Sequence, residues 1–288
     1  MKVLVLTDSD LDGSGSALAI KWLYAEKDAN ITVVELIGQD YSGIIRGLAK
    51  SFDRYDRIFI TDSYVPEDVI ALVDIPKMVI VDHHQDHINV ADQYKHAKTV
   101  LKLYPSCCKL IVDVFKLELT DERKQLVKLI NDYDSYQLEF KETLMLNCIF
   151  NTYNRPKVNK FIDAFYDGMR EFTTFEKNAI RIYFRKVKET LDGLDVYKGQ
   201  IGEHSVISFF VDHALNEVTH TLLKQTGADI AIAVAQSYGG VSFRRSKTCT
   251  AKLNVLAAAL CDGGGHEYAA GGKITPKFLE FTKKLELC

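Results

Sequence analysis

The chain has 288 residues, of which 47% are hydrophobic and 26% are charged, a composition typical of a soluble globular protein. Its formal net charge is −3 and its pI is about 6.3. This balance argues against a general binder of long duplex nucleic acid, because that affinity depends on clustered Lys and Arg side chains. A short anionic substrate, or one held through metal ions, is compatible with the charge.

The six cysteines show no C-x-x-C spacing, and the N-terminus carries no secretory signal. No apolar run approaches the length that a membrane span needs. We therefore expect a soluble protein of the reducing cytoplasm that has no membrane partner.

The first part of the chain alternates short β-branched runs with longer amphipathic stretches, which predicts βαβ units and a parallel sheet. The predicted strands are Val3–Leu6, Ile31–Leu36, Arg57–Ile60 and Met78–Val81. The predicted helices between them are Ser14–Glu26, Ser42–Phe52 and Pro66–Val73. The handedness rule for parallel strands makes these helices right-handed crossovers.

Helical patterns dominate from about residue 107 to residue 191, and we interpret this block, with Val158–Tyr166 and Phe172–Leu191, as a connector. Further strands are predicted at Val206–Val211, Asp229–Ala235 and Val241–Arg245, and further helices at Ala214–Lys224 and Ala251–Leu260. Three glycines within Gly193–Gly202 indicate a boundary. We predict an α/β fold with a parallel-sheet domain over residues 1–192, which includes the helical connector, and a smaller α/β domain over residues 203–288.

Acidic and histidine residues stand at the carboxyl ends of the predicted strands. The first strand is followed by Asp8, Asp10 and Asp12, the third by Asp62, and the fourth by Asp82, His83 and His84. Because an open parallel sheet gathers these ends along one edge, we expect the side chains to converge in a crevice. Carboxylate and imidazole ligands suit Zn, Mn or Fe, so a metal site is the leading interpretation.

Simpler explanations account for only part of the acidic pattern. Helix capping by Asp12 or Ser14 explains one carboxylate but not three. The D-x-D-x-D-G run also begins an EF-hand loop, but Ala19 stands at the twelfth position, where a bidentate Glu is required. A zinc-protease motif fails because Gln85 takes the place of the general-base Glu.

Two later clusters are weak evidence for a functional site by themselves and become significant together with the earlier ones. Asn131–Asp134 ends a helical run and alone would predict only turn or cap residues. Gly263–His266, followed by Ala269–Gly272, predicts either a tight turn or glycine amides that face an anion. His87 and His96 alone are typical of ordinary loop residues.

In this order the clusters resemble the motifs of the DHH phosphoesterase superfamily with its C-terminal DHHA1 domain. The matching residues are Asp8, Asp10, Asp12 and Gly13 for the first motif, Asp62 for the second, Asp82, His83 and His84 for D-H-H, Asp132 for the fourth, and Arg245-Ser246, Gly263–His266 and Ala269–Gly271 for the DHHA1 signature. The chain looks most like the short nanoRNases. It departs from them at Asp8, where many have His, and in the fourth motif, where either Asp132 or Asp134 is the ligand.

The resemblance implies two divalent metal ions, with Mn²⁺ the expected metal, bridged by Asp62 and a water. The other implied metal ligands are Asp8, Asp10, Asp12, His83 and Asp132. Asp82 would orient an imidazole, and His84 would contact the scissile phosphate and stabilise the charge that develops there.

The resemblance also implies that the smaller domain binds substrate. The residues concerned are Arg245, Gly263, Gly264, Gly265 and His266. Strand alternation puts Arg245 on the face of Val241 and Phe243 and puts Arg244 on the other, so one of the two arginines is expected to face the substrate.

We therefore expect a Mn-dependent phosphodiesterase, nanoRNase-like, that degrades short single-stranded oligonucleotides or dinucleotides to mononucleotides. The alternative is a hydrolase of cyclic or linear dinucleotides or of 3′-phosphoadenosine phosphate. A RecJ-type exonuclease is less expected, because no segment follows the DHHA1-like region to form another strand-binding domain. A catalytically inactive DHH scaffold is a different class, and the retention of every expected ligand type argues against it. The sequence is compatible with a homodimer.

Overall fold

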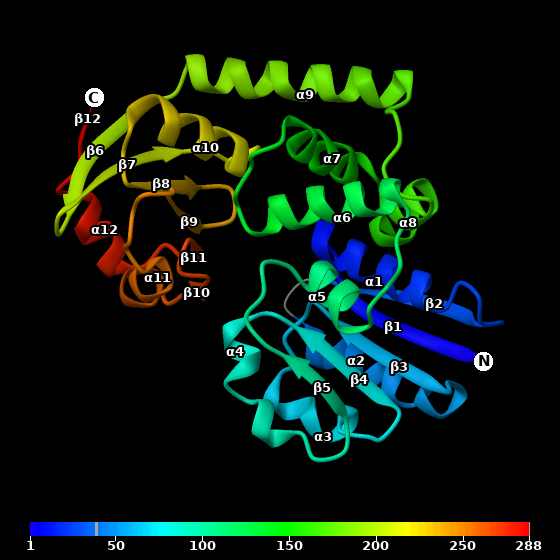
Figure 1. Ribbon diagram of the computed structural model, residues 1–288. Coiled ribbons are helices and arrows are strands. Elements are labelled where there is room, and N and C mark those ends of the chain that lie inside the picture. Colours follow the sequence, from blue (N-terminus) through cyan, green and yellow to red (C-terminus); the bar gives the residue numbers. More distant parts are fainter. Residues whose placement is uncertain (38–39, 288) are drawn as a thin grey trace. The chain divides into compact units, whose positions relative to one another are not determined.

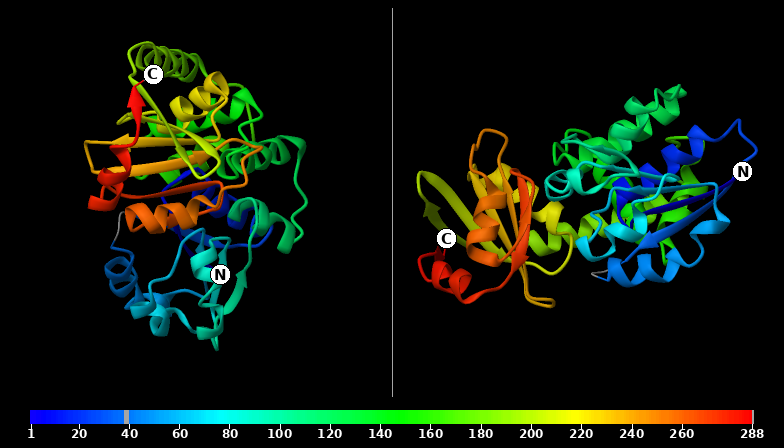
Figure 2. Two further views of the ribbon diagram at one scale, coloured as in Figure 1. Left: turned by 90° about the vertical axis from the view of Figure 1, so that its left-hand side faces the viewer. Right: turned by 90° about the horizontal axis from the view of Figure 1, so that it is seen from below.

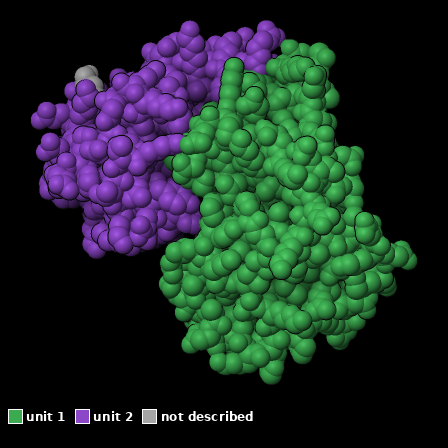
Figure 3. Space-filling model, viewed as in Figure 1, with its two compact units in different colours: residues 1–180 green, residues 181–288 purple. Residues whose placement is uncertain are grey.

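The computed structural model describes residues 1–37 and 40–287, and its chain divides into two compact units, Met1–Ile180 and Arg181–Cys288 (Figure 3). The division falls within helix α9, Thr174–Asp192. Cys288, the sixth cysteine, lies outside the described residues. Within the described ranges, no helix combines the length and the apolar character that crossing a membrane requires.

Unit 1 is built on a five-stranded, wholly parallel sheet with the strand order β2-β1-β3-β4-β5 (Figures 1 and 2). The strands are β1 (Lys2–Asp8), β2 (Asn30–Leu36), β3 (Arg57–Thr61), β4 (Met78–Asp82) and β5 (Lys98–Leu101). The four predicted strands and the parallel sheet are confirmed, and β5 adds an edge strand that the sequence analysis misses. The strand order reverses between β1 and β3, which is where open α/β sheets bind ligands.

Helices cover both faces of this sheet (Figure 1). The helices of unit 1 before α9 are α1 (Leu11–Leu23), α2 (Tyr41–Ala49), η1 (Phe52–Arg54), η2 (Glu67–Val69), α3 (Ile70–Val73), α4 (Gln85–Ile88), η3 (Ala91–Gln93), α5 (Cys107–Val114), α6 (Asp121–Asp134), α7 (Lys141–Thr152) and α8 (Lys157–Phe165). Helix α1 packs against α5, α6 and α8. These helices of the predicted connector are thus part of the packing of unit 1.

The residues of β1 alternate between two buried faces. Leu4 and Leu6 belong to a core with Ile45 of α2 and Val73 of α3, and each is 0% exposed. Val3 also is completely buried, on the face that α1 covers. Coverage on both sides explains the continuous apolar run of this strand, and each large side chain so buried stabilises the fold by roughly 1.5–3 kcal/mol.

Unit 2 is built on a seven-stranded mixed sheet with the order β10-β11-β9-β8-β7-β6-β12. Its elements are β6 (Val196–Ile201), β7 (His204–Phe210), α10 (Leu215–Thr226), β8 (Ile230–Ala235), β9 (Gly240–Arg245), α11 (Leu253–Cys261), β10 (Gly264–Gly265), β11 (Ala269–Lys273), α12 (Pro276–Thr282) and β12 (Glu286–Leu287). Helix α10 packs on one face, and α11 and α12 on the other. The glycine-rich stretch 193–202 contains β6, which pairs with β7.

A half-buried ion pair stabilises the beginning of α9. Arg170 donates to both carboxylate oxygens of Glu176, at 2.9 Å from Nη1 and 2.8 Å from Nη2. The Thr173 amide donates to the same carboxylate at 2.7 Å. The hydrogen bond from Arg170, and less strongly those from Thr173, lower the pKa of Glu176 from 4.5 to about 2, although burial acts in the opposite direction.

We expect Glu176→Gln to destabilise the protein at neutral pH. Because the folded-state pKa is lowered, the stability from this pair is present above about pH 4.5 and is lost as the pH falls towards 2. Charged hydrogen bonds are worth roughly 1.5–3 kcal/mol, and partial exposure of Arg170 places this one at the lower end. Urea unfolding should show a difference that shrinks between about pH 4.5 and pH 2. The control, Glu171→Gln, breaks only an exposed pair with Lys177, and a pH-independent difference for Glu176→Gln would contradict the assignment.

Candidate metal centre

Three neighbouring strands deliver acidic residues to one edge of the unit 1 sheet. Strand β1 ends at Asp8, Asp62 directly follows β3, and β4 ends at Asp82. The residues before them are paired across the three strands: Thr7 with Thr61, and Thr61 with Val81. The three aspartates therefore lie level with one another at the strand-order reversal, as the sequence predicts.

The turn from β1 into α1 places Asp10 and Asp12 beside this edge. Asp10 is the N-cap of α1 and accepts a hydrogen bond from the Gly13 amide at 2.8 Å, so the cap is neither Asp12 nor Ser14. Gly13 lies against the end of β1, where an added Cβ would be only 2.3 Å from the Asp8 carbonyl oxygen. The D-G pair of the first motif thus meets a steric requirement of the turn.

The carboxylate of Asp12 is held by the N-terminus of α5. The amides of Cys107 and Cys108 donate to its two oxygens at 2.6 and 3.0 Å. Both amides belong to the first turn of α5, where helix N–H groups lack partners within the helix. Asp12 is 2% exposed, and its burial raises its pKa despite the opposing effect of His83.

His83 lies at the centre of the cluster. Its Nδ1 is 2.9 Å from the Tyr104 carbonyl oxygen, which can only accept, so Nδ1 donates this hydrogen bond and, in the neutral ring, Nε2 carries the lone pair. Nε2 faces three carboxylates, at 3.4 Å from Asp62 Oδ1, 3.5 Å from Asp134 Oδ2 and 3.8 Å from Asp12 Oδ2. A carbonyl that fixes the tautomer of a histidine is the usual support for a metal-binding imidazole.

Asp62 combines an unusual backbone with an unfavourable electrostatic environment. Its φ is 52°, in the left-handed region that aspartate tolerates better than most residues. The carboxylate is 2% exposed, and burial together with the charges of Asp12, Asp10 and Asp134 raises its pKa well above the ordinary value. A buried site that accumulates negative charge in this way requires cations or protons.

Asp82 differs from these carboxylates because both of its oxygens are engaged in hydrogen bonds. Its Oδ1 accepts from the His83 amide at 2.8 Å and lies 2.7 Å from His84 Nδ1, while Oδ2 lies 2.7 Å from His87 Nδ1. These bonds lower the pKa of Asp82 although burial opposes them. Burial alone would lower the pKa of His84, but the Asp82 hydrogen bond and charge raise it to about 9.

His87 is a site residue that the sequence analysis misses. It is completely buried, and its ring connects Asp82 to the Tyr94 hydroxyl, 2.7 Å from Nε2. The expectation of an ordinary loop residue is therefore wrong for His87. The available signal was its spacing from the D-H-H motif, on the turn of helix α4 that follows β4.

The fourth-motif aspartate that joins the cluster is Asp134. Its Oδ2 is buried without a hydrogen-bond partner, and burial and the charges of Asp12 and Asp10 raise its pKa well above the ordinary value. Asp132 instead accepts from the Glu139 amide at 3.0 Å and from Thr143 Oγ1 at 2.6 Å. Of the two fourth-motif candidates, Asp134 therefore lies in the cluster beside His83, whereas Asp132 joins the end of α6 to the start of α7.

The remaining two predicted ligands lie at the rim of the cluster. Asp8 accepts a hydrogen bond from the Tyr41 hydroxyl at 2.9 Å. The pKa of Asp10 is raised to about 7, first by desolvation and then by the charges of Asp8 and Asp12. Part of the Asp10 surface is nevertheless open to solvent, so its carboxylate is the more accessible of the acidic groups.

In unit 2, Arg245 and Arg244 lie on opposite faces of β9, as strand alternation predicts. Val241 and Phe243 are buried in the core beneath α11, and Arg245, on their side, donates to the Ala251 carbonyl at 2.6 Å. Arg244 lies on the α10 side and donates to Asn216 at 3.0 Å.

The predicted Gly263–His266 loop forms a tight β10–β11 hairpin. The Gly263 amide donates to Ala257, and the His266 amide to Ala269 at 2.8 Å, so neither amide is available for the predicted anion nest. An added Cβ at Gly263 would be 1.9 Å from the Gly271 oxygen, which explains this glycine sterically. The His266 ring stacks on Tyr268, with 5.1 Å between ring centroids and 3° between planes.

Comparisons with known proteins identify the architecture. No family model and no curated protein matches the chain. Among solved structures, the pGpG-specific phosphodiesterase PggH of Vibrio cholerae is 14% identical with a TM-score of 0.59, and the match covers 99% of this chain and 97% of that one. A solved DHH domain, described as a member of a family of ribosomal proteins, is 12% identical with a TM-score of 0.59, over 99% and 87% of the two chains.

RecJ of Thermus thermophilus, solved with Mn²⁺, is 13% identical with a TM-score of 0.54; 98% of this chain matches 51% of that chain. The chain thus spans about half the length of that RecJ. At these identities the likeness shows the fold. The chain has the fold of these solved structures, which include a DHH domain, and this confirms the predicted fold class.

Proposed function

We propose that this protein is a metal-dependent phosphodiesterase that degrades short oligonucleotides to mononucleotides. The observation that carries the proposal is the position of His83 Nε2, which lies 3.4 to 3.8 Å from carboxylate oxygens of three aspartates. The DHH fold, and neighbours described as a pGpG phosphodiesterase and a manganese-bound RecJ, support a phosphate ester as the substrate.

The donor set fits hard or borderline divalent cations. Buried carboxylates with raised pKa values, and the buried Asp134 oxygen that has no hydrogen-bond partner, favour an arriving positive charge. Mn²⁺ accepts both carboxylate oxygen and imidazole nitrogen. The proposed ligands of two such ions are Asp8, Asp10, Asp12, Asp62, His83 and Asp134. When bound, such ions polarise the phosphoryl group and stabilise the charge that develops on it.

His84 is the proposed contact to the scissile phosphate. In the metal-free protein the pKa of His84 is raised to about 9, first by its hydrogen bond to Asp82, so the imidazole is protonated at neutral pH and carries a positive charge. Its side chain is 41% exposed, whereas its partner Asp82 is completely buried. Asp82 thus orients His84 and keeps it cationic, and the charged imidazolium can bind a phosphate oxygen and stabilise its growing charge.

Substrate recognition is proposed for residues of unit 2. The π-face of the stacked His266–Tyr268 pair suits a base, and Arg245 offers guanidinium donors to a phosphate. Gly263, Gly264 and Gly265 then act through the tight hairpin that presents His266.

A product time course with Mn²⁺ tests the proposed activity. Because the net charge is −3, each further nucleotide of a longer strand should gain few contacts with the protein. Turnover should therefore be fastest on substrates of about two to five nucleotides. The assay compares labelled dinucleotides, pentamers and strands of about twenty nucleotides with cyclic dinucleotides and 3′-phosphoadenosine phosphate, and Asp62→Asn is the inactive control. Equal or faster degradation of the longest strands would favour a RecJ-type exonuclease instead.

A hydrolase of linear dinucleotides is the second candidate. The PggH structure, described as specific for pGpG, matches almost the whole of both chains. Rapid cleavage of pGpG with little cleavage of pentamers in the same assay would select this narrower activity.

His87 is the proposed positioning residue for this reaction. His87→Phe retains a buried ring but removes the hydrogen bond to Asp82, so kcat should fall by about 10–100-fold, with KM for a dinucleotide little changed. His87→Asn can still donate to Asp82 and should recover part of the loss. Tyr94→Phe, which removes only the outer hydrogen bond, is the matched control and should have a smaller effect. Equal kcat values for His87→Phe and the parent protein would exclude this role.

A further inference from the structure

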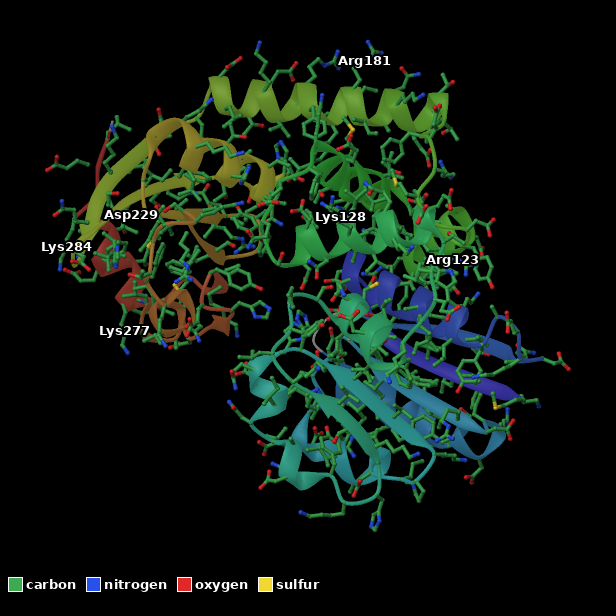
Figure 4. All side chains as sticks on the ribbon, viewed as in Figure 1. Arg123, Lys128, Arg181, Asp229, Lys277 and Lys284 are labelled. Atoms are coloured by element: carbon green, nitrogen blue, oxygen red, sulfur yellow. The ribbon has the colours of Figure 1, made fainter. Side chains whose placement is uncertain are left out.

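A second group of metal-ligand side chains lies in unit 2. His204 is the first residue of β7, Asp229 directly precedes β8, and Cys249 lies in the segment between β9 and α11. The parallel pairing of β7 and β8 brings the first two to the same end of the sheet. Asp229, before the start of β8, is labelled in Figure 4.

Backbone hydrogen bonds fix the three segments to one another. The Asp229 amide donates to the Ser205 carbonyl at 3.1 Å, and the Ser246 amide donates to the Asp229 carbonyl at 2.8 Å. The Cys249 amide closes a turn onto Ser246 at 3.2 Å. The positions of His204, Asp229 and Cys249 therefore follow from the sheet and its turn.

The ligand atoms of these side chains are spaced as a tetrahedral metal site requires. Cys249 Sγ lies 3.7 Å from His204 Nδ1, and one ligand atom from each of the three residues lies within 4.8 Å of the others. Tetrahedral bonds of about 2.3 Å to sulfur and 2.0–2.1 Å to nitrogen put these two atoms about 3.6 Å apart. The sulfur–nitrogen pair thus needs almost no movement to bind one ion.

Ser205 fixes the orientation of the Asp229 carboxylate. The amide and the hydroxyl of Ser205 both donate to Asp229 Oδ2 at 2.9 Å. Both bonds end on the same oxygen, so Oδ1 can turn towards an ion. His204 and Asp229 are half-buried while Cys249 is 5% exposed, which gives an ion access from one side.

We propose that His204, Asp229 and Cys249 form a binding site for a thiophilic divalent cation of the zinc class. Binding releases the thiol proton of Cys249 to solvent and leaves a thiolate ligand. The three protein ligands leave a fourth position for water, and the ion joins the β6–β7 turn, the α10–β8 loop and the segment after β9. This donor set differs from the carboxylate-rich centre of unit 1, because thiolate and imidazole together select zinc over manganese or magnesium.

Cobalt(II) titration of the reduced, metal-free full-length protein tests the proposal. A thiolate ligand produces a sulfur-to-cobalt charge-transfer absorption that oxygen and nitrogen ligands do not produce, and added Zn²⁺ should abolish it by displacement. We expect the band in the parent protein and its absence in Cys249→Ser. Cys261→Ser, which changes another buried cysteine of unit 2, is the matched control and should retain the band.

A second pair of variants keeps the test independent of folding and of the first centre. Asp229→Asn should weaken cobalt affinity by more than about 10-fold while the band keeps its position, because the thiolate remains. Asp62→Asn, which alters the unit 1 centre, should leave the band unchanged. No band in the parent protein, or a band that persists in folded Cys249→Ser, would overturn the proposal and leave His204 and Cys249 as a simple hydrogen-bonded pair.

Discussion

Asp134→Asn should reduce metal-dependent turnover by more than about 100-fold, whereas Asp132→Asn should leave most of it intact. Asp134 Oδ2 lies 3.5 Å from His83 Nε2, and loss of its charge removes a proposed ligand. Even residues that only support a metal ligand are worth about 10–100-fold, so a ligand is worth more. Asp132 binds the Glu139 amide and Thr143, so its replacement acts on stability.

The two variants should therefore separate in two measurements. Calorimetric Mn²⁺ titration should show much weaker binding for Asp134→Asn and near-parent binding for Asp132→Asn. Urea unfolding without metal should show the opposite order, with Asp132→Asn less stable by about 1–3 kcal/mol, since a buried carboxylate that accepts several hydrogen bonds is replaced. Loss of Mn²⁺ binding in a folded Asp132→Asn protein would return the ligand role to Asp132.

The sequence predicts the convergence of the acidic residues well where strands position them. Asp8, Asp62 and Asp82 follow apolar runs, and parallel pairing alone requires that such residues meet at one edge. His83 follows directly from the same rule. Neither inference depends on how the helices pack.

Helix packing decides what the sequence leaves open. Asp132 and Asp134 are two residues apart on α6, so they point to nearly opposite sides, and only the packing of α6 against α1 and α5 selects the side that faces His83. His87 was missed because a single histidine on the one-turn helix α4 produces no periodic pattern.

Short edge strands were also beyond the sequence analysis. Strand β10 consists of Gly264–Gly265, and β12 of Glu286–Leu287, so neither carries the β-branched residues by which strands are recognised. They exist because neighbouring strands pair with them. The amides of Gly263 and His266, which the sequence pattern suggested for binding an anion, instead form hydrogen bonds to backbone carbonyls at this hairpin.

Asp62→Asn should make the metal-free protein more stable and remove most of the stabilisation by Mn²⁺. The raised pKa of Asp62 means that its negative charge destabilises the metal-free fold at neutral pH, through burial and the charges of Asp12, Asp10 and Asp134. Asparagine has no charge and tolerates the φ of 52° at this position. At 100 times its dissociation constant, Mn²⁺ should stabilise the parent by about 2.7 kcal/mol.

Thermal unfolding with and without Mn²⁺ measures both effects in one experiment. In a domain the size of unit 1, each kcal/mol of stability shifts the melting temperature by roughly 2–4 °C. Without metal, the variant should therefore melt at a higher temperature than the parent. With Mn²⁺, it should melt at a lower temperature than the parent. Asp53→Asn, an exposed aspartate of unit 1, is the control and should keep the parent's response to metal. If Asp62→Asn melted lower than the parent without metal, the carboxylate would be stabilising the fold, and the view that these aspartates are retained for cation binding at a cost in stability would be wrong.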